Sequence, residues 1–75
     1  MQKLKVKSPR SDYIYYFSIQ DNGDGTRTLT AESQWLGAKN PNDLQRRWQV
    51  TLDEQGLSRL ARLLHLSTLY EETLQ

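Results

Sequence analysis

The chain has 75 residues, with 10 Lys and Arg, 9 Asp and Glu, one His and no Cys, so it allows one small domain and excludes a two-domain enzyme with a cleft between its halves. Because Cys is absent, disulfides and thiolate metal sites are excluded, which leaves oligomerisation or docking on a partner to stabilise so small a domain. The net charge of +1 and the pI of 8.1 lie below the basic excess that is typical of a dedicated duplex-DNA binder.

Residues 1–12 form a basic leading segment in which lysines at positions 3, 5 and 7 alternate with Leu4 and Val6. This alternation is compatible with an edge strand, because lysines on an edge resist further strand pairing. Whether the segment forms a strand stays open. No apolar stretch follows the lysines, and no apolar run approaches the ~18 residues of a membrane-spanning helix. We therefore expect no secretory signal, no membrane association and a cytoplasmic protein.

Residues 13–52 are predicted to form an antiparallel sheet. The first strand covers 13–20, and its alternation places four apolar side chains toward the core: Tyr13, Tyr15, Phe17 and Ile19. The segment 21–25, Asp-Asn-Gly-Asp-Gly, predicts a tight hairpin turn.

Two further strands follow at 26–36 and 44–52, separated by a Pro-containing loop at 37–43. Strict alternation points Leu29, Ala31, Ser33 and Trp35 inward from the first of these strands. In the second it puts Arg46 on the same face as the apolar residues Leu44, Trp48, Val50 and Leu52, and Arg47 on the opposite face.

A main helix is predicted over 53–66, with Asp53 as N-cap or with Thr51 and Glu54 as a capping box. Its apolar stripe comprises Leu57, Leu60, Ala61 and Leu64. Residues 67–75 predict a short helical tail behind a second cap at positions 67 and 68. The fold class is α+β, a three- or four-stranded antiparallel meander packed by one C-terminal helix in the order β-β-β-α.

Little material for catalysis is present. His65 is the only histidine, and neither a second His nor a Cys exists to complete a transition-metal site or a histidine-based triad. The acidic loop at 21–26 lacks the ligand spacing of a calcium loop. We therefore expect a protein that is not an enzyme, with no catalytic residue, no metal site and no cofactor.

The C-terminal third carries more leucine than a small sheet can cover, and such an apolar surplus usually marks an interface. The candidate interface residues are Leu63, Leu66, Leu69, Tyr70 and Leu74. The leading interpretation is a non-catalytic interaction module, a small accessory, regulator or inhibitor protein, that docks on a larger protein or forms a homo-oligomer. Alternatively, the tail folds back and covers these leucines itself.

The outer face of the sheet offers a second interpretation. Between residues 26 and 64 a Trp-and-Pro hairpin leads to the strand-to-helix junction Val-Thr-Leu-Asp-Glu-Gln at 50–55, followed by the leucine stripe. This order resembles the single-stranded-DNA-binding transcriptional coactivators of the positive-cofactor-four type. The resemblance implies dimerisation through helices and single-stranded nucleic-acid binding by the sheet. The contacts that it implies are Tyr16, Arg27, Arg46 and Arg47.

Overall fold

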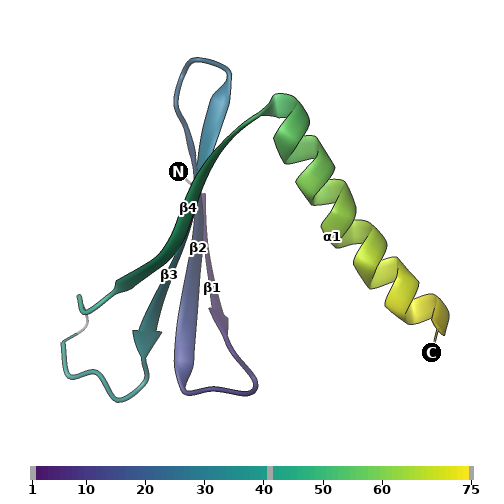
Figure 1. Ribbon diagram of the computed structural model, residues 1–75. Coiled ribbons are helices and arrows are strands. Elements are labelled where there is room, and N and C mark those ends of the chain that lie inside the picture. The colour runs from purple at the N-terminus through teal and green to yellow at the C-terminus, as the bar shows by residue number, and fades with distance from the viewer. Residues whose placement is uncertain (1, 41, 75) are drawn as a thin grey trace.

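Four strands and one helix follow one another along the chain, as the computed structural model in Figure 1 shows. The structure describes the backbone of residues 2–40 and 42–74 and the side chains of residues 2–40 and 42–65. The elements are β1 (Gln2–Lys7), β2 (Tyr13–Asp21), β3 (Thr26–Trp35), β4 (Gln45–Asp53) and α1 (Glu54–Leu74). The strands form one antiparallel sheet in the order β1-β2-β3-β4, which confirms the predicted α+β meander. The leading segment, left open by the sequence, forms the fourth strand at one edge.

The register sorts the side chains of the sheet onto two faces, because directly paired residues point to the same side. One row crosses all four strands through the pairs Leu4–Phe17, Phe17–Ala31 and Ala31–Trp48. We call the side that carries this row the apolar face. The opposite side, the polar face, carries the β1 lysines and, among others, Tyr16, Thr28, Thr30 and Thr51. The predicted phases of the strands at 13–20 and 26–36 are confirmed.

The turn between β2 and β3 is built by glycine and by acidic side chains. Gly23 and Gly25 have φ of 80° and 89°, a left-handed conformation that costs glycine little and other residues much. Asp21 accepts a hydrogen bond from the Gly23 amide at 2.9 Å, and Asp24 accepts one from the Thr26 amide at 3.0 Å. The predicted tight turn is therefore present, held by its own side chains.

A β-bulge in β4 overturns the predicted orientation of Arg46 and Arg47. Ala31 pairs with Trp48, but the next residue of β3, Glu32, pairs with Arg46, so β4 holds one extra residue at this point. Strict alternation fails there. Arg46 lies on the polar face opposite Glu32, and Arg47 reaches the apolar face, where its Nε donates to the Ser33 Oγ at 2.6 Å.

Helix α1 begins with the predicted cap, since Oδ1 of Asp53 accepts a hydrogen bond from the Gly56 amide at 2.7 Å. Gly56 faces Leu52, whose Cβ lies 3.3 Å from the position of an added Cβ. The predicted second cap and separate tail helix are wrong, because α1 continues unbroken through residues 67 and 68 to Leu74. Ser and Thr are tolerated inside a helix, and neither Gly nor Pro follows Gly56 to stop it.

Sheet and helix form the two limbs of an inverted V that joins at the end of β4 (Figure 1). The helix packs against β4 near this joint and then leaves the sheet. The radius of gyration is 14.8 Å, against about 11 Å for a compact domain of this length. Among the described side chains only Ala31 and Ser33 are buried. The part of the chain whose side chains are described therefore builds a sheet and a helix but encloses almost no core between them.

Candidate interaction surface

Aromatic side chains form the centre of the apolar face. Phe17 and Trp48 lie on either side of the small, buried Ala31, with ring centroids 6.4 Å apart and planes tilted by 45°. Tyr15 stacks beside Phe17 at 6.1 Å. Both distances lie in the range of favourable aromatic pairs. This cluster keeps one side open, since Phe17 is 37% and Trp48 is 48% exposed.

Aliphatic side chains extend the cluster toward both edges of the sheet. Leu4 and Val6 of β1 and Val50 of β4 are exposed. A hollow of about 320 Å³ lies on the same face, lined among others by Leu4, Phe17 and Leu29. The apolar face thus presents exposed apolar side chains of β1, β2 and β4, and Trp35 at the end of β3, around the buried Ala31. Such surfaces are rare on proteins that act as isolated monomers.

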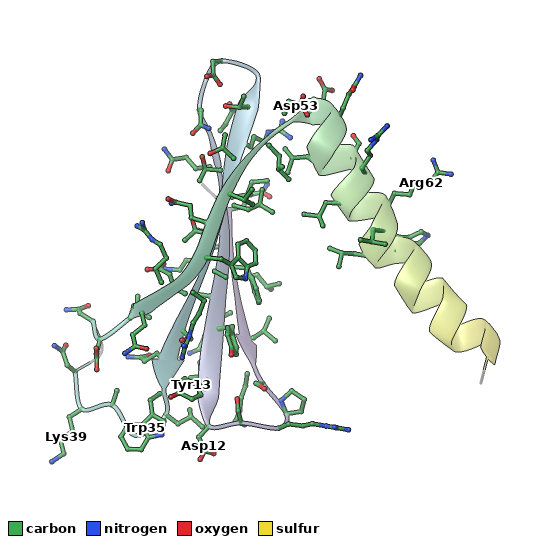
Figure 2. All side chains as sticks on the ribbon, in the orientation of Figure 1. Asp12, Tyr13, Trp35, Lys39, Asp53 and Arg62 are labelled. Atoms are coloured by element: carbon green, nitrogen blue, oxygen red, sulfur yellow. The ribbon has the colours of Figure 1, made fainter. Side chains whose placement is uncertain are left out.

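Arg47 lies at one end of the apolar face. Its guanidinium lies 5.2 Å from the centroid of the Tyr13 ring, within the range of a cation–π contact, and its Nε satisfies the buried hydroxyl of Ser33. Tyr13 and Trp35 lie together at the end of the sheet that is far from the helix joint (Figure 2). The β4 bulge thus places a cation at the border of the apolar face.

The helix forms the second limb of the surface. Leu57 and Leu60 are partly covered near the joint, whereas every residue from 61 to 65 is exposed. Leu63 is 60% and Leu64 62% exposed. Figure 2 shows Arg62 on the side of α1 away from the sheet. Two residues turn a helix by about 200°, so Leu64 lies toward the side that the V encloses.

Of the five predicted interface residues, the structure describes the side chain of Leu63 alone, and this side chain is exposed. The side chains of Leu66, Leu69, Tyr70 and Leu74 lie outside the part that the structure describes. The sequence interpretation missed the sheet half of the surface, because residues that alternate inward were counted as core. The sequence did contain a signal for an uncovered sheet: one amphipathic helix has a single narrow apolar stripe, which cannot cover the inward-facing residues of four strands.

The polar face holds only two of the four predicted nucleic-acid contacts. Tyr16 and Arg46 lie on this face. Arg27 lies on the apolar face, as its pairing with Asp21 and Leu52 shows, and the bulge turns Arg47 to the apolar face as well. The four residues therefore do not form one site.

Lysine and hydroxyl side chains occupy the rest of the polar face. Nζ of Lys3 lies 5.1 Å from the centroid of the Tyr16 ring. Thr28 and Thr51 share a hydrogen bond at 2.9 Å between β3 and β4, and Gln49 donates to Thr30 at 3.1 Å. These contacts stabilise a solvated sheet face by cross-strand pairing.

No three His, Asp or Glu side chains of the described residues gather into a group that could hold a metal ion. Within the same part of the chain, no helix is long and apolar enough to cross a membrane. Comparisons with protein-family models, with curated proteins and with solved structures find no match to this chain.

Proposed function

We propose that this protein is a non-catalytic interaction module whose docking surface is the apolar face together with the inner side of α1. The observation that carries the proposal is the row that crosses all four strands, in which Leu4, Phe17 and Trp48 are exposed around the small, buried Ala31 of β3. Side chains of this kind contribute about 1.5–3 kcal/mol each when another surface covers them. A small accessory, regulator or inhibitor protein acts through such a surface.

The energetic centre of this surface is expected at Phe17 and Trp48. Binding energy concentrates in large aromatic side chains that fill the middle of an interface, while the surrounding residues exclude water. Trp48 lies between Val50 and Arg47 on β4, so an aromatic centre has an aliphatic neighbour on one side and a cation on the other. Arg47 at the border favours a partner that presents an acidic or carbonyl group there.

Site-specific photo-crosslinking in cells that produce the protein tests the docking surface. A photoreactive phenylalanine analogue is placed at position 48 on the apolar face, and at position 16 as a control on the polar face. We expect position 48 to give a protein–protein product of one defined mass, and the control to give none. The absence of any product from position 48, or a nucleic-acid product from position 16, would overturn the proposal.

A second candidate is the binding of single-stranded nucleic acid by the polar face. The observation that favours it is the alignment of Lys3, Lys5 and Lys7 along one side of β1, with Tyr16 in the neighbouring strand. Lysines spaced two residues apart on a strand can follow a phosphate backbone, and an aromatic ring can stack a base.

Salt-dependent oligonucleotide binding decides between the two functions. For a phosphate binder, the double variant Lys3→Ala with Lys5→Ala should reduce the slope of log affinity against log salt by about 0.7 for each lost contact. Arg27→Ala is the control for position: it removes one positive charge from the other face and should leave the slope unchanged. For an interaction module we expect no oligonucleotide binding in the parent chain or in either variant.

A further inference from the structure

We propose that the surface is covered by a second copy of this chain, and that two V-shaped chains interlock around a two-fold axis. Each helix α1 then lies inside the V of its partner, between the partner's apolar face and the partner's helix. The resulting order of layers is sheet, helix, helix, sheet. This proposal rests on the proposed docking function and names the occupant of the docking surface.

The surplus accessible area of one chain matches the area that each chain of a stable dimer buries. A compact monomer of this mass exposes about 4,800 Å², whereas the chain exposes 6382 Å². The excess is about 1,600 Å² per chain, or roughly 3,200 Å² for two chains, which lies in the range of permanent homodimers at about 2,000–5,000 Å². One copy of the chain therefore carries as much surplus surface as one half of a permanent interface buries.

The two edges of the sheet do not favour assembly by strand addition. Edge strand β1 carries lysines at positions 3, 5 and 7, and such lysines oppose the approach of a further strand. Edge strand β4 carries the bulge at Arg46 and Arg47, which interrupts the regular backbone that a new strand would pair with. The broad apolar face is left as the route to association.

The helix also needs a partner that the sheet of its own chain does not supply. Beyond Leu60 every described residue of α1 is exposed. In proteins most helical stability comes from the packing of an apolar face rather than from intrinsic helix propensity. In the interlocked dimer the same stretch is packed from two sides, by the second helix and by the partner's sheet.

The charge order along α1 fits an antiparallel pair of identical helices. By sequence, the cations Arg59 and Arg62 stand in the first half of the helix, and the anions Glu71 and Glu72 stand near its end. A two-fold axis near His65 brings position 59 of one helix beside position 71 of the other. The Arg at position 59 and the Glu at position 71 then meet twice, once on each side of the axis, because a closed two-fold contact uses the same surface on both chains.

Sedimentation equilibrium of the purified chain measures the proposed assembly. We expect a mass of twice 8.8 kDa at micromolar concentration. Leu63→Glu places a carboxylate in the interface twice per dimer and should raise the dissociation constant by about 100-fold or more. Gln20→Glu adds the same charge to an exposed position on the polar face, outside the proposed interface, and should leave the dimer intact.

A charge exchange tests the antiparallel geometry. Arg59→Glu should weaken the dimer, because each helix then presents an acidic residue beside position 71 of the second copy, which is also acidic. Adding Glu71→Arg to the same chain should restore it, since opposite charges meet again. A parallel or unrelated contact predicts no restoration. Circular dichroism on each variant verifies that the fold is kept.

The outcomes separate this inference from the proposed function. A mass of 8.8 kDa together with a protein crosslink from position 48 would overturn the second copy and keep the docking surface. A monomer without such a crosslink would overturn both. A dimer that neither Leu63→Glu nor the charge reversal weakens would overturn the interlocked geometry.

Discussion

Arg47 and Arg46 are neighbours in the sequence with opposite environments. Arg47 donates to the buried Ser33 hydroxyl and lies over the Tyr13 ring, whereas Arg46 lies on the exposed polar face. Arg47→Ala leaves a buried polar group without its donor, which costs about 1–3 kcal/mol. Arg46→Ala should stay within about 0.5 kcal/mol of the parent. Urea unfolding at one fixed protein concentration measures both, and equal losses would contradict the bulge.

The structure lowers the pKa of the Asp24 carboxyl below its ordinary value. A hydrogen bond from the Thr26 hydroxyl, followed by one from the Thr26 amide, lowers the pKa below 3.8. A lowered folded-state pKa contributes stability that is present above the unfolded value and is lost as pH falls through the folded value.

We therefore expect the β2–β3 hairpin to weaken on acidification below pH 3.8. A carbon-detected NMR titration should give Asp24 an apparent pKa below that value. Asp24→Asn replaces the carboxylate with an amide, whose oxygen still accepts a hydrogen bond but which does not titrate. The hairpin of this variant should therefore lose this part of its pH dependence. An Asp24 titration at or above 3.8 would show that the Thr26 contacts do not form in solution.

At the scale of elements, the joint between β4 and α1 depends on the cap at Asp53. Its carboxylate satisfies the Gly56 amide at the first turn, so Asp53→Ala should cost about 1 kcal/mol, whereas Asp53→Asn, which also caps well, should cost a few tenths. Circular dichroism at 222 nm during thermal unfolding measures the difference. A similar loss for both variants would mean that charge rather than capping matters at this joint.

The strands were largely predictable because their alternation is local. The face of Phe17, the turn at Gly23 and Gly25 and the cap at Asp53 all follow from neighbouring residues. The orientation of Arg46 and Arg47 did not, because a bulge depends on how two strands meet and not on the pattern of one strand. The continuity of α1 also escaped prediction, since a Ser-Thr pair has the same sequence signature at a cap as inside a helix.

At the scale of the whole molecule, the sequence predicted which residues share a face but not whether anything covers that face. Phe17 is the clearest case: its inward orientation is confirmed, yet the side chain is 37% exposed because α1 turns away from the sheet. Burial depends on the angle between β4 and α1, which the alternation of apolar residues does not encode. The surplus of leucine in the helix, and the narrow apolar stripe of one helix against four strands, were the sequence signals of this open surface.

The emission of Trp48 as a function of protein concentration tests most directly that association covers the apolar face. In a Trp35→Phe background, Trp48 is the only tryptophan. We predict blue-shifted emission at high concentration, where the second copy covers the indole, and a red shift on dilution as the chains separate. Blue-shifted emission that persists at every dilution, from a chain whose mass is 8.8 kDa, would contradict the account because the helix would then fold back over its own sheet.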